Sequence, residues 1–249
     1  MKLSVMQPYF FPYMGYFQLL NHSDHLVVFD VVQYNKKSWM NRNRLIHPRD
    51  VNGFQYTSVP VQKHSKGTLI QDIQIDQESN WQTRLMGQLT VYKKLNAPNY
   101  LVIKELVEEI IFQKHVTLNQ LLVKCLAETC KYIGINLEYE FASNLKLEKS
   151  AIKQPGDWAL EISKLKEAQE YINLPSGYEI FDEKRFLNSG VRLKFIKSHL
   201  SPYPQSRREE FNAGLSIIDV LMFNNLSHVK NILETDYAIH NQKSLKSEL

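Results

Sequence analysis

The order of apolar and polar positions in the first 34 residues predicts a β–α–β unit. The short apolar run "LSVMQP" is typical of a buried strand, and "GYFQLLNHSD" is typical of a helix that ends in a polar turn. The run "HLVVFDVVQY" is almost continuously apolar, as parallel strands are when helices cover both faces of a sheet. The turn after the first strand and the polar end of the second strand then share the carboxyl edge of the sheet, where open α/β sheets bind ligands.

The rest of the chain alternates between extended and helical patterns. We predict extended segments at 54–61 and 69–76, and helices within 81–134, where Thr117 suits an N-cap and Gly134 a C-terminal stop. Beyond these, the pattern predicts the strand "NLEYEFAS", an amphipathic helix capped by Asp157, the strands "EYINLPSGYEIF" and "VRLKFIK", and the apolar helix "SIIDVLMFNNL".

This order of elements predicts an α/β fold with a Rossmann-like N-terminal β–α–β sheet, a helical middle and an α+β C-terminal part. We place the Rossmann-like part at 1–80, the helical part at 81–134 and the α+β part at 135–233, and we expect one compact unit. Residues 234–249 lose their apolar periodicity, so we expect a frayed tail there.

Composition excludes several classes of protein. The net charge of +4, from 30 basic and 26 acidic residues, suits an anionic small molecule but is too weak for a nucleic-acid binder. Cys125 and Cys130 are the two cysteines, so there is no disulfide framework and no cysteine-based metal site. The eight histidines lack the spacing of a metal site, and no apolar run reaches the ~18 residues of a membrane span. We expect a cytoplasmic protein with no metal, no membrane span and no tightly bound cofactor.

The stretch "MQPYFFPYMGYFQLL", residues 6–20, places aromatic residues where a simple reversal of the chain would use Gly, Asn, Asp or Ser. Pro8 and Pro12 stiffen the turn, and Gly15 lets a ligand or the backbone approach the helix start, whose unpaired N–H groups attract anions. We predict a rigid ligand wall in which Gln7, Tyr9 and Tyr16 face the pocket, while Phe10, Phe11 and Phe17 anchor the turn in the core. The alternative is an aromatic core plug beneath the first helix.

The segment "PYMGY" within this stretch has the spacing of the His-x-Gly-His signature found in nucleotidylyltransferases and pantothenate-synthetase-like ligases. Tyr13 and Tyr16 replace both histidines. A phenol can hold a phosphate oxygen, but it does not bring the charge of an imidazolium. The spacing therefore favours a shared fold more than a shared nucleotide chemistry.

The stretch "DVVQYNKKSWMNRNRLI", residues 30–46, is a candidate site for an anionic ligand. Arginine binds phosphate or carboxylate in two-point contacts, asparagine reads hydroxyls and amides, and a tryptophan offers a flat face to a sugar or base. The alternative is a solvated basic loop. The residues from which we expect ligand contacts are Gln33, Tyr34, Trp39, Asn41, Arg42, Asn43 and Arg44.

Asp30 lies within an apolar strand, where a lone carboxylate costs several kcal/mol unless it is paired or reaches solvent. It is either a pocket-facing general base or half of a buried ion pair with Arg42 or Arg44.

Near the C-terminus, Ser216 and Asp219 have the Ser-x-x-Asp spacing of a helix capping box, which needs no function. In the loop before them we expect ligand contacts from Tyr203, Gln205 and Arg207.

Five stretches together resemble the WbqC-like family: the two quoted above, "YKKLNAPNYL", "YINLPSGYEIFDEKRF" and "LSIIDVLMFNN". The resemblance runs from about residue 3 to residue 226 and is most specific in the first two stretches. Members sit in bacterial gene clusters for O-antigen and other surface polysaccharides, so the resemblance implies modification of a sugar in lipopolysaccharide biosynthesis. It extends to Gln7, Pro8, Tyr9, Gly15, Tyr16, Asp30, Gln33, Tyr34, Trp39, Asn41, Arg42, Asn43, Arg44, Ser176, Gly177, Ser216 and Asp219.

Such a resemblance implies a transferase that moves an acyl or aminoacyl group to the amine of a nucleotide-linked amino sugar. The donor would be a thioester of coenzyme A or of an acyl carrier protein, and residues 36–44 would hold the phosphates. Asp30 or His25 would act as general base, Tyr9 would hold the oxyanion, and Tyr13 would contact the substrate. Two alternatives stay open: an ATP-dependent nucleotidyl-transferring enzyme or ligase with a degenerate His-x-Gly-His motif, and a non-catalytic module that binds a sugar nucleotide or a partner. An oligomer is compatible with the sequence.

Overall fold

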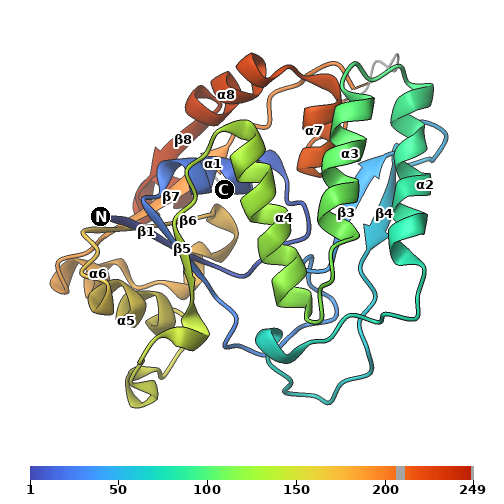
Figure 1. Cartoon of the computed structure of the whole chain (residues 1–249). Helices are drawn as coiled ribbons and strands as arrows, with labels where there is room; N and C mark the ends of the chain where they lie inside the picture. The colour runs from blue at the N-terminus through green and yellow to red at the C-terminus, as the bar shows by residue number, and fades with distance from the viewer. Residues whose placement is uncertain (206–210, 248–249) are drawn as a thin grey trace.

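A computed structural model describes residues 1–205 and 211–247 of the chain (Figure 1). Within these residues, six strands form a central sheet in which the first five strands across it are parallel and the last is antiparallel to its neighbour. In order across the sheet, the strands are β5 (Tyr139–Phe141), β2 (His25–Val28), β1 (Lys2–Met6), β6 (Glu170–Asn173), β7 (Arg192–Ser198) and β8 (Tyr237–His240).

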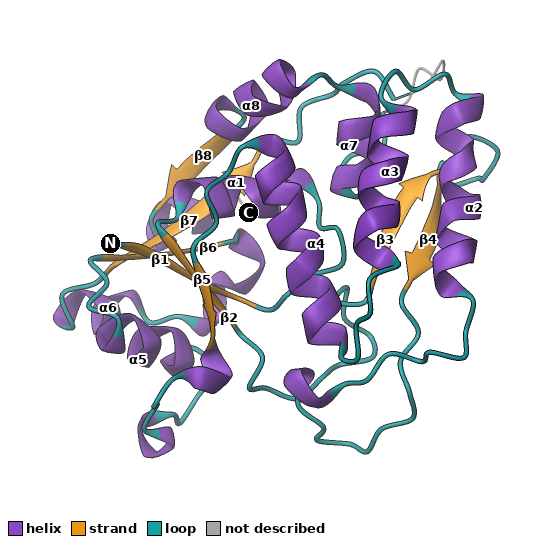
Figure 2. Cartoon of the chain, in the orientation of Figure 1, coloured by secondary structure: helices purple, strands orange, loops and turns teal. Residues whose placement is uncertain are grey.

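Helices cover both faces of this sheet (Figure 2). Successive side chains of a strand point to opposite faces, so the apolar residues of one strand contribute to two cores. Val28 of β2 belongs to the larger apolar core, whereas its neighbour Val27 belongs to the smaller one. The larger core contains residues of α1 (Met14–His22), α4 (Leu118–Ile133) and α8 (Leu226–Thr235). The smaller core contains residues of α5 (Asp157–Leu165), α6 (Glu183–Asn188) and α9 (Gln242–Lys246).

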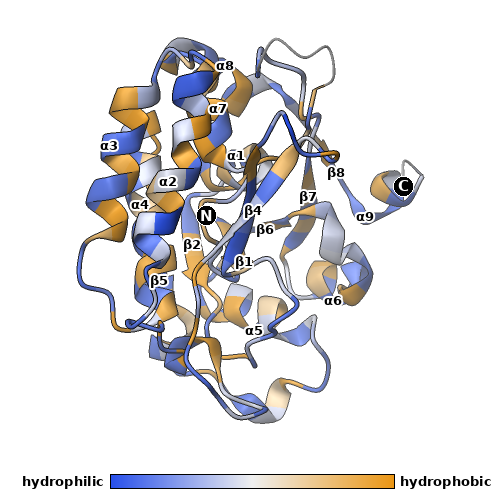
Figure 3. Cartoon of the chain, turned by 90° about the vertical axis from the view of Figure 1, so that its right-hand side faces the viewer, coloured by the Kyte–Doolittle hydropathy of each residue, from blue (hydrophilic) through white to orange (hydrophobic). Residues whose placement is uncertain are grey.

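A two-stranded antiparallel hairpin stands beside the main sheet. It consists of β3 (Arg42–Ile46) and β4 (Phe54–Ser58), and it packs against α2 (Trp81–Lys94) and α7 (Ile217–Phe223). Next to α2 lies α3 (Tyr100–Ile111), and Figure 3 shows hydrophobic and hydrophilic residues mixed along both helices, as expected when one face is buried. Short 3-10 helices complete the described chain: η1 (Ile70–Asp72), η2 (Ala142–Asn144), η3 (Lys149–Ala151) and η4 (Pro175–Ile180).

The predicted α/β class is confirmed, and β1–α1–β2 forms the expected unit with two parallel strands. The predicted ends of α4 are also present: Thr117 forms a capping box with Gln120, and Gly134 ends the helix in the left-handed conformation with φ +84°. A closer likeness to the nucleotidyltransferase fold stays a prediction.

The second predicted strand is shorter than the sequence indicated, and a short 3-10 helix interrupts the predicted extended segment at 69–76. The second strand ends at Val28, and 69–76 forms η1 with isolated bridges in place of a strand. The reason is that the chain beyond Phe29 leaves the sheet, and the N–H groups of Ile70 and Gln71 bond to the carbonyls of Val32 and Asp30. This departure decides where Asp30 points.

The expectation of a frayed tail over 234–249 is wrong for its central part. β8 pairs with β7 from Tyr237 to His240, and Leu245 of α9 is fully buried. An edge strand of four residues and a helix of five are too short to show an apolar period, so the sequence pattern missed them.

A Cβ on Gly156 would clash with the carbonyl oxygen of Ile180 in η4. Backbone atoms cannot yield cheaply, so Gly156→Ala should lower the free energy of unfolding by about 1–3 kcal/mol. Gly87→Ala in α2 is the control: a Cβ there meets no atom within 4 Å, and the change should stabilise the helix by about 0.5–1 kcal/mol. Urea unfolding measures both, and equal stability of the two variants would contradict the close approach.

Candidate functional site

A cleft of about 740 Å³ opens at the carboxyl ends of β1 and β6. The two strands pair at Lys2–Glu170 and Leu3–Tyr171, and the later residues Val5, Met6 and Asn173 line the cleft. The chain builds β2 and β5 on one side of β1 before it returns to β6 on the other, so the strand order reverses here. This is where open α/β sheets bind ligands, and the volume lies within the usual ~300–1,000 Å³ of small-molecule sites.

The lining of the cleft is rich in aromatic residues and poor in charge. Arg44 is the single charged residue among the described lining residues, which include no Asp, Glu, His, Lys or Cys. An anion that enters therefore meets a cation and no opposing carboxylate from this lining. The aromatic members are Tyr9, Tyr13, Tyr16, Phe29, Trp39, Trp158, Tyr171 and Phe181.

The turn after β1 is held in a strained conformation. Phe11 has φ +40°, in the left-handed region that bulky side chains rarely adopt. Its carbonyl oxygen accepts hydrogen bonds from Asn43 Nδ2 at 2.6 Å and from Ser216 Oγ at 2.8 Å, and Asn43 Nδ2 also contacts the carbonyl of Phe10 at 3.2 Å. Two segments far away in sequence thus fix this turn.

Tyr16 and Gly15 serve the packing of the same turn. The buried Tyr16 hydroxyl donates to the carbonyl of Gln7 at 2.8 Å, and burial raises the pKa of this phenol. A Cβ on Gly15 would lie 2.5 Å from the ring of Tyr13 and 3.0 Å from Ser198 Cβ. The space that we expected a ligand to use at Gly15 is therefore filled by side chains. Phe10, Phe11 and Phe17 lie in the core, where the sequence analysis placed them.

The guanidinium of Arg44 is held between two rings. Its carbon lies 5.4 Å from the centroid of Trp39 and 4.9 Å from that of Phe54, and Nη2 donates to the carbonyl of Gly214 at 3.0 Å. Its Nε–H is buried without an acceptor among the described residues. Burial raises the pKa of the nearby Tyr9 phenol, and the positive charge of Arg44 offsets part of that rise. The site therefore offers a fixed cation and a neutral hydroxyl donor.

Arg42 stands two residues before Arg44 on β3 but is outside the described lining. Its guanidinium carbon lies 5.0 Å from the centroid of Trp39 and 5.8 Å from that of Tyr56, and Nη2 donates to the carbonyl of Lys37. Neither arginine forms an ion pair with a carboxylate of the described chain.

Both placements that we expected for Asp30 are wrong. Its carboxylate is 1% exposed, accepts hydrogen bonds from the N–H and hydroxyl of Ser143 and from Asn119 Nδ2, and neither lines the cleft nor pairs with an arginine. The chain leaves the sheet after Val28, which turns this side chain toward η2 and α4. His25 lies at the amino end of β2, where Nε2 is 2.9 Å from Glu140. The cleft thus lacks both expected bases.

Other predicted contacts hold the scaffold. Asn41 donates to the carbonyl of Val59, Tyr34 packs against the ring of His64, and Gln33 bridges to Leu69. Of the candidate ligand contacts, the described lining includes Gln7, Tyr9, Tyr13, Tyr16, Trp39 and Arg44, together with Ser176 and Gly177. It does not include Gly15, His25, Asp30, Gln33, Tyr34, Asn41, Arg42, Asn43, Tyr203 or Gln205, and Arg207 lies outside the described residues. The roles of the lining residues as ligand contacts stay predictions.

The candidate contacts predicted from the sequence do not include the far wall of the cleft. Trp158 of α5, Asn173 at the end of β6, and Ile180 and Phe181 come from the C-terminal half. The apolar pattern predicts one strand over "EYINLPSGYEIF", but β6 stops at Asn173 and Pro175–Ile180 forms η4. The signal was present, because Pro-Ser-Gly after a buried strand marks a loop at the carboxyl edge.

Asp219 of α7 is fully buried and does not line the cleft. Its carboxylate accepts hydrogen bonds from the hydroxyls of Tyr92 at 2.8 Å and Tyr203 at 2.7 Å and from Gln205 Nε2 at 3.1 Å. Burial raises the pKa of Asp219 to about 6, although these donors offset part of the effect. The expected capping box is half present: Ser216 accepts from the N–H of Ile218, but the carboxylate is occupied elsewhere.

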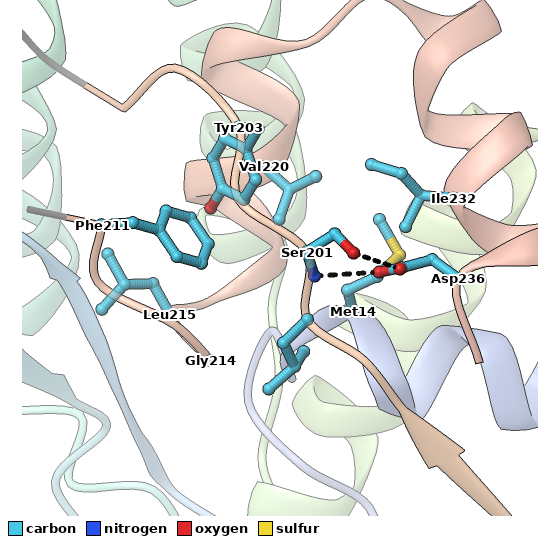
Figure 4. Close-up of a pocket in the computed structure, with 10 residues that line it drawn as sticks. Met14, Ser201, Tyr203, Phe211, Gly214, Leu215, Val220, Ile232 and Asp236 are labelled. Carbon is cyan, nitrogen blue, oxygen red and sulfur yellow. Dashed lines mark hydrogen bonds between the residues drawn. The ribbon is translucent and has the colours of Figure 1, made fainter. Parts of the chain in front are cut away.

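A second, smaller cavity adjoins the cleft at Leu200 and Gly214 (Figure 4). It measures about 20 Å³, which is room for about one water molecule. At its rim, the N–H and hydroxyl of Ser201 donate to Asp236. The larger cleft is therefore the candidate ligand site.

No group of three or more His, Cys, Asp or Glu that could hold a metal ion occurs in the part of the chain that the structure describes. In the same part, no helix is both long and apolar enough to cross a bilayer.

Comparison with known proteins gives a family match over most of the chain. The model of the family described as "WbqC-like protein family" matches residues 7–231. The chain is 26% identical over 223 residues to "Uncharacterized protein Rv1507c" of Mycobacterium tuberculosis, and the similarity covers 88% of this chain and 92% of that protein. No solved structure matches the chain significantly.

The strained turn generates a stability prediction. Asn43→Ala removes the shared donor of two buried carbonyls, so the free energy of unfolding should fall by about 1–3 kcal/mol. Asn35→Ala removes an exposed Asn side chain that accepts one hydrogen bond, from the N–H of Lys37, so its effect should be smaller, about 0.5–1 kcal/mol. Chemical unfolding measures both, and an Asn43→Ala protein as stable as Asn35→Ala would show that this amide does not hold the turn.

Asp219 generates a pH prediction. Its pKa is about 6 in the folded protein, whereas an exposed aspartate carboxyl has a pKa of 3.8, so between these values the folded state binds more protons than the unfolded state. The contribution of Asp219 to stability should therefore fall by about 3 kcal/mol as pH rises from about 4 to 6, and then level off. Urea unfolding of the wild type and Asp219→Asn at several pH values isolates this difference, and parallel stability curves would contradict it.

Proposed function

The chain belongs to the WbqC-like protein family, and from this premise we propose that it binds a nucleotide-linked amino sugar and modifies that sugar during surface polysaccharide biosynthesis. The polysaccharide context comes from the gene clusters in which members of the family sit. The ligand would occupy the cleft at the carboxyl ends of β1 and β6.

The observation that carries this proposal is the state of Arg44. It is a cation in an aromatic cleft, is held by Trp39, Phe54 and Gly214, and keeps a buried Nε–H without an acceptor among the described residues. A buried donor without a partner calls for a ligand or a water molecule. A diphosphate in the cleft would bind the Arg44 side chain where it lines the cleft, through charge-assisted hydrogen bonds.

The remainder of the cleft suits the other parts of such a ligand. Trp39 is 39% exposed and offers a ring face to a base, while the hydroxyls of Tyr9 and Tyr13 are neutral donors for sugar oxygens. Burial raises the pKa of Tyr13 to about 12, so this phenol stays protonated near neutral pH. Ser176 and Gly177 line the opposite wall.

The reaction that we propose is acyl or aminoacyl transfer to the sugar amine. The amine nitrogen attacks the thioester carbonyl, the carbon–sulfur bond breaks, and the leaving thiolate takes up the proton that the nitrogen loses, which gives an amide and a thiol. Tyr9, which lines the cleft, would donate to the developing oxyanion. Because the described lining holds no carboxylate or imidazole, the amine would enter in its neutral form.

The same lining favours a second candidate, a module that binds a sugar nucleotide without turnover. A general base must lie within about 3 Å of the proton it takes, and Asp30 and His25 are engaged elsewhere. The ATP-dependent alternative is less well supported, because Tyr16 of the His-x-Gly-His-like spacing uses its hydroxyl to hold Gln7.

Binding is tested first by isothermal titration with UDP-, dTDP- and GDP-linked sugars. Arg44→Gln should weaken the affinity about 10- to 100-fold, since hydrogen bonds to charged groups contribute about 1.5–3 kcal/mol. Arg44→Lys keeps the charge but loses the planar fork, so we expect it to weaken binding as well.

Arg192→Gln, an exposed arginine of β7 outside the cleft, is the matched control and should bind as the wild type does. Equal affinity of the wild type and Arg44→Gln for every ligand that binds would refute the proposed site. Release of free thiol from a thioester donor in the presence of the bound amino sugar then separates the transferase from the binding module.

A further inference from the structure

The β3–β4 hairpin has two faces that meet different surroundings. Arg44 and Tyr56 are register partners, so they lie on one face, and Arg44 lines the cleft. Leu45 and Gln55 are the next partners and lie on the other face. On that side, a groove of about 530 Å³ runs between the end of the hairpin and α2, and it shares no lining residue with the cleft.

The groove is basic. Arg49, Arg84 and Lys94 line it together with His47, and its described lining includes no Asp or Glu. Arg84, Gly87, Val91 and Lys94 follow one another at steps of three or four residues along α2, so they lie on one side of the helix. None of the three permanent cations forms an ion pair with a carboxylate in residues 1–205 or 211–247.

Gly87 keeps the floor of the groove open. It lies in the middle of α2, where glycine costs about 0.5–1 kcal/mol relative to alanine, yet a Cβ there would meet no atom within 4 Å. Packing therefore does not require the glycine, and its effect is to leave space in the groove.

Two polar atoms in the lining are buried without a partner among the described residues: His47 Nδ1 and Gln88 Oε1. Gln88 holds its place by donating Nε2 to Gln55 Oε1 and to the carbonyl of Tyr56. An amide oxygen only accepts hydrogen bonds, as phosphate oxygens do, so any phosphate contact in this groove comes from its cations.

We propose that this groove is a second binding site and that it takes a ligand carrying a chain of phosphate groups. Arg49, Arg84 and Lys94 contact the phosphate oxygens, and Val91 and Leu95 provide an apolar strip for the rest of the molecule. The inference does not depend on the proposed function of the cleft, because it rests on different residues.

The test uses inorganic tripolyphosphate as the probe and NMR of the full chain labelled with ¹⁵N-glycine. Nine glycines give few resonances: Gly87 reports on the groove and Gly177 on the cleft. We expect the Gly87 resonance to shift on titration in the wild type and in Arg44→Gln alike.

Lys94 and Lys93 form a matched pair, because both are exposed in the last turn of α2 and Lys94 is the one that lines the groove. Lys94→Gln should weaken the affinity reported by Gly87 on the order of 10-fold, and Arg84→Gln should act similarly. Lys93→Gln should leave that affinity unchanged.

Each other outcome overturns the proposal. If Gly87 does not shift at millimolar tripolyphosphate, the groove does not bind phosphate chains. If Gly177 shifts and Gly87 does not, the probe binds in the cleft alone. If Lys93→Gln and Lys94→Gln weaken binding equally, the attraction comes from the general charge of the helix end.

Discussion

The left-handed backbone of Phe11 is the constraint on which the candidate site depends. Such a conformation costs on the order of 1–3 kcal/mol for a bulky residue. The three contacts from Asn43 and Ser216 to the carbonyls of Phe10 and Phe11 contribute about 0.5–1.5 kcal/mol each, which is enough to offset that cost. Because these donors lie 32 and 205 positions away from Phe11, the turn is stable only when the hairpin and α7 are in place.

Strand β3 couples this constraint to the chemistry of the cleft. Successive residues of a strand point to opposite faces, so Asn43 reaches the turn while Arg44 reaches the cleft. The carbonyl of Arg44 also accepts the N–H of Ser216, and its guanidinium bonds to Gly214. Thus Asn43 and Ser216, which fix the turn, also hold the backbone of Arg44. Its guanidinium is held by Trp39, Phe54 and Gly214, so a ligand would find it already oriented, at little further cost in side-chain entropy.

The sequence predicted the elements better than the site. Apolar periodicity is a local signal, so it located β1, α1 and α4. The unusual aromatic turn contributes Tyr9 and Tyr16 to the lining of the cleft, and their roles as ligand contacts stay predictions. Burial within a long-range hydrogen-bond network is not local: Asp30 is held by Ser143, and Asn43 is held against Phe11, through contacts of 113 and 32 positions. For the same reason, the sequence does not distinguish the pair Asn41–Arg42 from the pair Asn43–Arg44. In the structure, Asn43 supports the turn and Arg44 lines the cleft.

The central claim is that Arg44 is the phosphate contact of a cleft at the carboxyl ends of β1 and β6. The most direct test is a crystal structure with whichever of the UDP-, dTDP- or GDP-linked sugars binds most tightly. The account predicts the diphosphate within about 3 Å of the Arg44 guanidinium, with the sugar beside Tyr9 and Ser176. A nucleotide sugar bound elsewhere on the protein, with Arg44 still lacking an acceptor for its Nε–H, would contradict it.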